Sequence, residues 1–415
     1  MKSKLFAILM VLSPSAFGAE PDGLKLPPGF HAQVVADGLA GARHIAVRAN
    51  GDIYISTNTP RGQTPVGIWA LRPGADHTAT PTHFSTITGG TGITIRGDAL
   101  YATTGSTVWR ISFDGDALIP SGSPEKVVDG MPNETNRNRI IRFDSEGNLY
   151  VALSGTGNNA CVVGGSRVAA PGPQPCPELK DRAGIWKFPA GKMNQNFSDG
   201  ELYATGNRNM SALDWAQGAL YGVLHERDST HELWPNFVSE AEDNAIGDGL
   251  YRISKGTDFG WPYTYYDGVR NIRLVAPEYG GDGKKTVPPG RYATPIFSFN
   301  SDKGRGAPTD MVFTNTRQFP AAWRNGFFLA LHGGLGEDRP GGYAGYDVLF
   351  LPMSADGKPG KPVVFADGFA GPTDDSKTQR RSAYRPVGIA QAPDGALYVV
   401  DTTKGRLWRI AYTGN

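Results

Sequence analysis

The sequence predicts an all-β fold: a six-bladed β-propeller closed by its first and last blades, with long inter-strand loops over a central funnel. Three observations predict it. A short unit recurs six times, each copy joins a Gly-containing turn to an apolar strand, and helical periodicity is nearly absent. The chain has 415 residues, of which 39% are hydrophobic and 20% charged, so it is long enough to bury a large core.

The recurring unit is a turn followed by an apolar strand that usually contains Tyr. Its copies are "NGDIYISTN", "RGDALYATTG", "SEGNLYVALSG", "AQGALYGVLHERD", "RNGFFLALHGG" and "PDGALYVVD". Most copies precede a second short strand such as "GIWAL", "TVWRI" or "RLWRI". Repeated short strands with a Gly turn and an aromatic residue are typical of propeller blades. A β-sandwich or a pair of barrels would also contain many strands, but it would not explain this repeat.

The two ends of the chain carry similar units because the first and last blades must meet to close the ring, which removes exposed sheet edges. Several copies are spaced more widely than a minimal blade requires. The largest insertions follow "HERD" and surround "PEYGGDGKKTVPPG". Loops of this kind gather at one end of a propeller and build its site.

The first residues read as an export signal. Lys2 and Lys4 precede the apolar "LFAILMVL", and small residues follow in "SAFGAE". This pattern predicts a signal peptide over residues 1–19 and a single propeller domain over residues 20–415; the alternative is a buried N-terminal helix. No later stretch approaches the roughly 18 apolar residues of a membrane span. We therefore expect a periplasmic or secreted protein that does not span a membrane.

Several classes of function are disfavoured. Lys plus Arg (41) nearly balances Asp plus Glu (40), so no strong field attracts nucleic acid. No Gly-rich loop or "GxSxG" pattern lies in the context that nucleotide binding or serine hydrolysis needs. No "CxxCH" is present for an attached haem. An electron acceptor, if one is needed, must therefore be a separate molecule.

Cys161 and Cys176 are the two cysteines of the chain, and they flank a Gly/Pro-rich segment. In an oxidising compartment, two such cysteines most simply form one disulfide that restrains the loop. A metal pair is the less favoured alternative, since no His or Cys lies beside them at ligand spacing.

Polar residues flank the predicted inner strands and should point into the funnel. They are Arg43, His44, residues 136–139, Arg208, Asn209, residues 225–228, His332 and Arg385. One Arg or His at such a place is usually structural. Recurrence at the same position of several blades would bring them to one axis. A ring of arginines with few acids indicates an anionic ligand, such as a polycarboxylate cofactor or an acidic substrate.

The motifs "LPPGFHAQVVADGLAGARHIAV", "ATGNRNMSALDW", "ERD", "GDGLYRISKGTDFGWPY", "LALHGG" and "YRPVGIAQAPDGALYVVDTTKGRLWRI" resemble the sorbosone dehydrogenase and pyranose dehydrogenase branch of the soluble quinoprotein sugar dehydrogenases. The resemblance covers nearly the whole chain after the leader. It implies a six-bladed propeller that holds pyrroloquinoline quinone on a Ca²⁺ ion in the funnel. It also implies oxidation of a sugar or an aldehyde.

Carried over by position, the resemblance implies that Arg208 and Asn209 contact the quinone and that Arg385 binds a cofactor carboxylate. Arg227 would face the cofactor, and His332 falls where the family places a cofactor-facing group. Arg43, from the same ring of arginines, is a further candidate for cofactor binding.

The implied metal ligands are Asp228 and Ser229, where the family's chain approaches Ca²⁺ partly through main-chain carbonyls. Oxygen ligands suit this hard cation. The family's "GDD" after "RD" is replaced here by Ser229, Thr230 and His231, which puts the affinity for the metal in question.

A second departure concerns the general base. The family's base His corresponds to Asn136, which cannot take a proton near neutral pH. His44, His225 and His332 are the candidates for a displaced base. Three functions stay open: a quinone-dependent dehydrogenase, a metal-dependent propeller lactonase or hydrolase, and a sugar- or cofactor-binding propeller without turnover.

Overall fold

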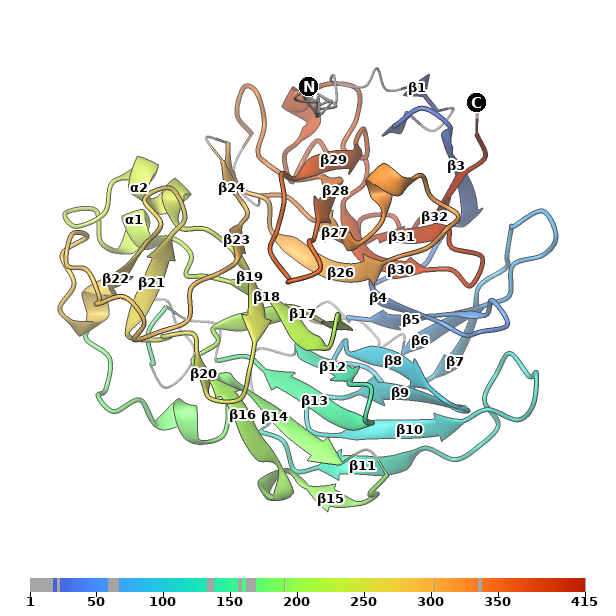
Figure 1. Ribbon diagram of the computed structural model, residues 1–415, viewed down its shortest axis with the longest axis horizontal. Helices are drawn as coiled ribbons and strands as arrows, with labels where there is room; N and C mark the ends of the chain where they lie inside the picture. Colours follow the sequence, from blue (N-terminus) through green and yellow to red (C-terminus); the bar gives the residue numbers. More distant parts are fainter. Residues whose placement is uncertain are drawn as a thin grey trace, which may run out of the picture.

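The structure is a computed structural model that describes residues 18–20, 23–58, 67–132, 138–155, 159–161, 169–189, 191–301, 303–334 and 338–414. Six sheets surround a common centre, as Figure 1 shows, and their strands are antiparallel except for two short added strands that pair in parallel. The prediction of an all-β six-bladed propeller is confirmed. The leader predicted for residues 1–19 lies mostly outside the described residues and stays a prediction.

The first three blades follow one another along the chain, each built from its inner strand outward. The first contains β4 (Ala42–Val47), β5 (Ile53–Thr57), β6 (Ile68–Leu71) and β7 (Thr82–Ser85). The second contains β8 (Ile93–Arg96), β9 (Ala99–Thr103), β10 (Val108–Ser112), β11 (Glu125–Asp129) and the added β15 (Gln195–Asn196). The third contains β12 (Arg139–Phe143), β13 (Asn148–Leu153), β14 (Gly184–Pro189), β16 (Glu201–Thr205) and the added β20 (Thr257–Asp258).

The last three blades complete the ring. The fourth contains β17 (Asn209–Ala216), β18 (Ala219–His225), β19 (Gly249–Ile253) and β23 (Phe297–Ser298). The fifth contains β26 (Pro308–Thr314), β27 (Gly326–Leu331), β28 (Asp347–Pro352) and β29 (Val363–Ala366). The sixth contains β30 (Pro386–Gln391), β31 (Leu397–Asp401), β32 (Leu407–Tyr412) and, as its outer strand, β3 (Phe30–Ala36).

Short elements decorate the ring. The helices are α1 (Thr230–Leu233), α2 (Glu240–Ala245) and 3₁₀ turns at Pro177–Lys180, Phe197–Asp199, Pro277–Tyr279, Ala321–Trp323 and Asp374–Ser376. The remaining strand pairs are β1 (Gly18–Ala19) with β2 (Lys25–Leu26), β21 (Thr264–Asp267) with β22 (Ile272–Val275), and β24 (Asn300–Ser301) with β25 (Gly304–Arg305). None of the helices in the described ranges has the length and apolar character that crossing a bilayer requires.

The sequence repeat marks the second strand of every blade. β5, β9 and β31 are buried along their whole length, as is β27. These strands lie between a neighbouring blade on each face, so both faces must be apolar, as in the middle of a layered sheet structure. This burial explains why the second strand reads as a continuous apolar run that is easy to find in the sequence.

Apolar clusters fill the six gaps between adjacent blades. For example, Tyr54 of the first blade packs with Leu100 of the second, and Tyr221 of the fourth packs with Phe327 of the fifth. The last gap holds Trp408 of the sixth blade and Phe350 of the fifth. Each blade is therefore held by its two neighbours rather than by a core of its own, so the ring must close to be stable.

The ring closes through β3, which pairs antiparallel with β32 from Phe30 opposite Tyr412 to Ala36 opposite Leu407. Figure 1 shows the blue N-terminal strand beside the red C-terminal one. Closure thus takes place within the sixth blade, which draws its strands from both ends of the chain. The pairing supplies hydrogen-bond partners along an edge of β32 that would otherwise be exposed.

The predicted insertion after "HERD" lies between β18 and β19 and contains α1 and α2. The insertion around "PEYGGDGKKTVPPG" follows β22, and both project from one side of the ring in Figure 1. The predicted disulfide between Cys161 and Cys176 is confirmed. It packs against Trp261, and the hydroxyl of Tyr279 accepts the Cys161 backbone N–H. The disulfide is therefore attached to the insertion after β22 through Tyr279.

Candidate functional site

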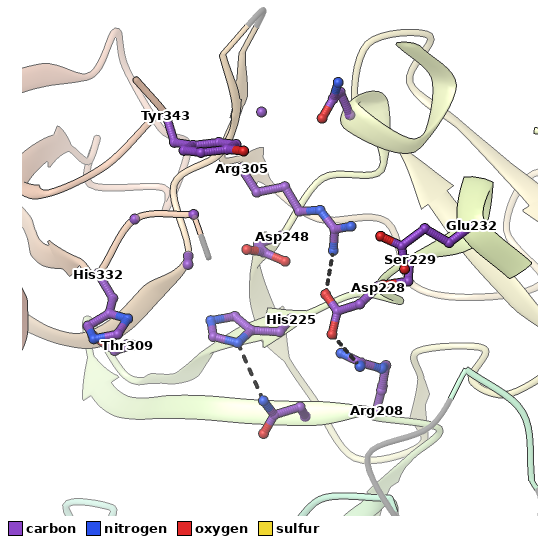
Figure 2. Close-up of a pocket in the computed structure, with 16 residues that line it drawn as sticks. Arg208, His225, Asp228, Ser229, Glu232, Asp248, Arg305, Thr309, His332 and Tyr343 are labelled. Atoms are coloured by element: carbon purple, nitrogen blue, oxygen red, sulfur yellow. Dashed lines mark hydrogen bonds and ion pairs between the residues drawn. The ribbon is translucent and has the colours of Figure 1, made fainter. Parts of the chain in front are cut away.

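A cavity of about 610 Å³ opens where the inner strands β17 and β26 begin (Figure 2). Its volume falls within the range typical of small-molecule sites. It is lined by Arg208, Asn209, His225, Asp228, Ser229, Glu232, Asn244, Asp248, Gly304, Arg305, Ala307, Thr309, His332, Gly333, Gly334 and Tyr343. Six of these were predicted from the sequence: Arg208, Asn209, His225, Asp228, Ser229 and His332.

A carboxylate bound by two guanidinium groups forms one wall of the cavity. Arg208 Nη2 lies 2.6 Å from Asp228 Oδ2, and Arg305 Nη1 lies 3.0 Å from Asp228 Oδ1 (Figure 2). Burial alone would lower the pKa of Arg305, but the nearby carboxylates, with Asp228 first and Asp248 next, raise it overall. Arg305 therefore stays charged, and this wall is a network of charge-assisted hydrogen bonds.

The main-chain oxygens beside this carboxylate also accept hydrogen bonds from side chains. Arg208 Nη1 donates to the carbonyl of Glu226 at 2.7 Å, and Arg305 Nη1 donates to the carbonyl of Arg227 at 2.6 Å. The carbonyl of Asp228 accepts from Asn159 Nδ2. Within the described ranges, no three His, Cys, Asp or Glu side chains are grouped to hold a metal. Protein donors thus occupy the segment to which the resemblance assigns Ca²⁺.

The hydrogen bonds of His225 fix its tautomer. Its Nε2 lies 2.6 Å from the carbonyl oxygen of Pro308, which can only accept, so Nε2 carries the proton. Its Nδ1 then accepts from Asn209 Nδ2 at 3.4 Å, while Asn209 Oδ1 accepts from Asn138 Nδ2 at 3.0 Å. Both ring nitrogens are engaged. The structure thus places the predicted base His225 in the cavity wall but leaves it no free nitrogen.

His332 follows β27 and borders the opposite side of the cavity (Figure 2). Its Nε2 is buried and has no hydrogen-bond partner among the described residues. Burial lowers the pKa of His332 well below its ordinary value of 6.5, and the charges of Arg385 and Arg43 lower it further. Its imidazole is therefore neutral at physiological pH, with one ring nitrogen that a ligand could engage.

Two predicted arginines, Arg43 and Arg385, lie behind the His332 wall rather than in the cavity lining. Arg385 donates from Nε to the carbonyl of His332 at 3.1 Å and from Nη2 to that of Gly333 at 2.9 Å. The side chain of Arg43 has no hydrogen bond or ion pair with any described residue and lines a separate cavity of about 420 Å³ together with Lys404. Burial, and then the charge of Arg385, lowers the pKa of Arg43. Positive charge is thus concentrated here, and no described carboxylate pairs with Arg43.

The structure does not bring His44 and Arg227 to the cavity. His44 Nδ1 lies 3.3 Å from Asp310 Oδ2 and links inner strands of the first and fifth blades. Arg227 is buried and makes a bidentate ion pair with Glu278, at 3.0 Å through Nη1 and 2.8 Å through Nη2. Its guanidinium is satisfied there and turns away from any cofactor in the funnel. Asn136 lies outside the described residues, so its predicted place in the site stays a prediction.

Sequence reasoning missed Arg305, Asp248 and Tyr343, all of which line the cavity. A signal for Arg305 was available. It precedes the inner strand β26 by a few residues, just as Arg208 precedes β17 and Arg385 precedes β30. The recurrence that identified the other arginines therefore applies to Arg305 as well.

Asp347 is a buried carboxyl group beside the site. It lines a cavity of about 340 Å³ that shares Tyr343 with the funnel cavity. Its Oδ1 has no hydrogen-bond partner in the part of the chain that the structure describes. Burial raises the pKa of Asp347 from 3.8 to about 7; Lys377 opposes this rise and Asp367 adds to it.

Asp347→Asn is expected to become more stable relative to the wild type as pH rises. The folded-state pKa of Asp347 lies above the unfolded value, so its stabilising contribution is complete below about pH 4 and is lost as pH rises through about 7. Between about pH 5 and pH 8, the difference in unfolding free energy should change by about 2–3 kcal/mol in favour of the variant. Urea unfolding at the two pH values measures it.

Asp401→Asn is the matched control for this prediction. The Asp401 carboxylate accepts backbone N–H bonds from Arg385, Thr403 and Lys404, so the amide should destabilise the protein at both pH values. A difference between Asp347→Asn and the wild type that does not change with pH would contradict a raised pKa for Asp347.

Comparison with known proteins gives a family and a fold. A family model described as TrAA12-like matches residues 24–246, more than half of the chain. No curated protein matches the chain. Three of the similar solved structures are the holo form of the pyranose dehydrogenase PQQ domain from Coprinopsis cinerea, the calcium structure of a family AA12 carbohydrate-active enzyme from Trichoderma reesei, and the PQQ-bound form of aldose sugar dehydrogenase from Streptomyces coelicolor.

The Coprinopsis cinerea structure matches with a TM-score of 0.71 at 17% identity, and the match covers 94% of this chain and 97% of that one. The second has a TM-score of 0.72 at 15% identity, with coverages of 96% and 98%. The third has a TM-score of 0.57 at 16% identity, with coverages of 93% and 99%. At such identities the likeness establishes the propeller fold.

Proposed function

The chain belongs to the TrAA12-like family, and from this premise we propose that it oxidises a sugar or an aldehyde with bound pyrroloquinoline quinone and passes the electrons to a separate acceptor. The observation that carries the proposal is the His332 wall of the funnel cavity. There a buried nitrogen of His332, which no described residue engages, lies within the influence of the charges of Arg43 and Arg385. Such a wall favours an anionic ligand that offers hydrogen bonds.

The residues fit a planar tricarboxylate. Gly333 and Gly334 carry no side chain into the cavity, and a Cβ at Gly333 would lie 2.2 Å from the Tyr346 ring, so this wall stays flat. Tyr343 presents an aromatic ring at the cavity edge (Figure 2). Arg208 and Asn209 on one side and the Gly333 and Gly334 backbone on the other would hold the quinone, with Arg43 and Arg385 supplying positive charge. The fit does not extend to Ca²⁺, because the main-chain oxygens of residues 226–228 accept hydrogen bonds from protein donors, two of which are guanidinium groups whose positive charge would repel the ion.

When bound, the quinone supplies a two-electron acceptor for a hydride from the substrate carbon. The protein must then take the proton of the substrate hydroxyl, which for an aldehyde is a hydroxyl of its hydrate. Among the described histidines, we assign this role to His332, because its ring borders the cavity and its Nε2 has no described partner. Since its pKa is well below 6.5, the rate should be nearly independent of pH above 6.5 and fall on the acid side. Asn136 remains the alternative position to test with Asn136→His.

Reconstitution tests the proposal. The purified protein, incubated with pyrroloquinoline quinone, should reduce an artificial dye in the presence of aldoses or aldehydes. His332→Gln should lower the rate by about 10²-fold or more, whereas His83→Gln, an exposed histidine on the outer strand β7, should leave it unchanged. Quinone binding without turnover of any aldose or aldehyde would favour the binding propeller. Metal-dependent hydrolysis without quinone would favour the lactonase.

Export to the periplasm or the medium belongs to this proposal. It is supported by the signal-peptide pattern and by the disulfide between Cys161 and Cys176, since disulfides persist mainly in oxidising compartments. A separate electron acceptor would have to reach the funnel there. Mass spectrometry of the mature N-terminus tests the cleavage.

A further inference from the structure

Arg305 binds the oxygen atoms that a divalent cation in this loop would use. Its Nη1 donates to the Arg227 carbonyl at 2.6 Å and contacts Asp228 Oδ1 at 3.0 Å, and its Nη2 lies 3.9 Å from Asp243 Oδ1. A main-chain carbonyl and two carboxylates are the oxygen ligands that Ca²⁺ prefers. Here their lone pairs already face a guanidinium group.

The fold holds Arg305 in this position. The residue ends the short strand β25, and its side chain is 17% exposed. Gly304, directly before it, has φ of +91°, a conformation that other residues rarely adopt. Arg208 completes the arrangement from the other side, at 2.6 Å from Asp228 Oδ2 and 2.7 Å from the Glu226 carbonyl.

Charge leads to the same conclusion. Asp228 faces two guanidinium groups, from Arg208 and Arg305, and the nearby carboxylates of Asp248 and Asp243 also act on Arg305. A divalent ion in the same place would have to displace Arg305 from three oxygens, and the displaced guanidinium would lose its charge-assisted bonds in a largely buried setting. The residues thus fit a fixed organic cation rather than a metal.

We propose that the Arg305 guanidinium stands permanently in the place of Ca²⁺, so that the funnel binds its anionic ligand without a metal. The proposal rests on the proposed function only for the identity of that ligand, pyrroloquinoline quinone. Arg305 supplies the positive charge next to the ligand and fixes the carbonyl of Arg227 and the carboxylate of Asp228. It is a positioning residue, and the wild-type protein has no divalent-cation site in this loop.

Titrations of the wild-type protein test this directly. Calorimetric titration with Ca²⁺ alone should give no binding at millimolar concentrations, which would saturate a site with a dissociation constant of roughly 10⁻⁴ M. The melting temperature should be the same in Ca²⁺ and in EDTA. Quinone binding, followed by its absorbance, should have the same dissociation constant in both buffers within about twofold.

Arg305→Ala should create the metal site that the wild type lacks. The freed carbonyl of Arg227 and carboxylates of Asp228 and Asp243 can then bind Ca²⁺, which should raise the melting temperature of the variant by about 2 °C or more relative to EDTA. Its affinity for quinone should fall about tenfold or more in EDTA and recover in Ca²⁺. Arg324→Ala is the matched control, because Arg324 also donates to two carbonyls, those of Phe319 and Arg317, but away from the funnel.

The outcomes separate the two proposals. Ca²⁺ binding by the wild type, or quinone binding that requires Ca²⁺, overturns the role of Arg305. If the wild type binds no quinone in either buffer, the proposed function fails, and the Ca²⁺ titration still decides whether Arg305 replaces the metal. The wild-type titration is also decisive if Arg305→Ala does not fold.

Discussion

Replacing Arg227 with methionine is expected to destabilise the protein by about 3–5 kcal/mol, because it leaves the Glu278 carboxylate buried without its charged partner. The side chains of Arg227 and Glu278 are 3% and 0% exposed. The remaining donor to Glu278, Trp234 Nε1 at 2.9 Å, cannot neutralise its charge. Urea unfolding measures the loss. The pair joins the "ERD" segment to the inserted segment, so the effect should extend to the funnel wall.

Two controls test whether the loss comes from the buried charge. Lys358→Met, which removes an exposed partner of Asp356, should cost no more than about 1 kcal/mol. The double change Arg227→Met with Glu278→Leu should cost less than Arg227→Met alone, because no uncompensated charge remains. The buried-pair account would be wrong if Arg227→Met left stability unchanged and weakened quinone binding, the result expected of a cofactor-facing arginine.

The fold could be predicted from the sequence because its strongest signal has a simple physical origin. Second strands such as β5, β9 and β31 are buried on both faces, so each blade must repeat a continuous apolar run after a turn. The outer strands carry much less signal. In β7, for example, no residue is buried. Outer strands can therefore vary freely, and the addition of β3 to the sixth blade was not visible in the pattern.

The site was only partly predictable, because neighbouring residues of one loop point to different surroundings. Glu226, Arg227 and Asp228 are consecutive, yet their side chains reach three separate places. Glu226 accepts from the Tyr251 hydroxyl at 3.3 Å, and burial raises its pKa. Arg227 pairs with Glu278, and Asp228 faces the cavity. Position relative to a strand predicts that a residue lies near the funnel, but the side chain's direction depends on partners from distant insertions.

The pairing of charges in the site could also not be predicted from the sequence. The sequence indicated a ring of arginines with few acids, and the structure divides that ring in two. Arg208 and Arg305 share Asp228, and Arg305 also lies near Asp243 and Asp248, whereas the side chain of Arg43 has no carboxylate partner among the described residues. Arg43 should therefore attract an anionic ligand through its charge, whereas Arg208 and Arg305 hold the wall that the ligand would contact. This distinction requires contacts between blades, which composition and spacing do not contain.

Arg43→Met is therefore expected to keep or slightly raise the stability of the ligand-free protein, by up to about 1 kcal/mol, while weakening quinone binding by about 10- to 100-fold. Stability should not fall, because the side chain of Arg43 makes no hydrogen bond or ion pair with the described residues, and its removal relieves repulsion from Arg385. Affinity should fall, because Arg43 acts on the anionic ligand through its charge from behind the wall, and an attraction of this kind over several ångströms contributes roughly 1.5–3 kcal/mol at an effective dielectric constant of about 20. Thermal unfolding without ligand and absorbance titration with pyrroloquinoline quinone measure the two effects.

Arg142→Met is the matched comparison for Arg43→Met. Arg142 Nε donates to the Leu213 carbonyl at 2.9 Å and lies 3.3 Å from Asp214 Oδ1, so it joins the third and fourth blades. Its loss should lower stability and leave quinone affinity unchanged. Opposite effects of the two substitutions would show that Arg43 contributes to quinone binding and not to folding stability, as expected of a residue in a functional site. If Arg43→Met destabilised the protein as much as Arg142→Met and kept its quinone affinity, Arg43 would be structural and the anionic ligand would have to bind elsewhere.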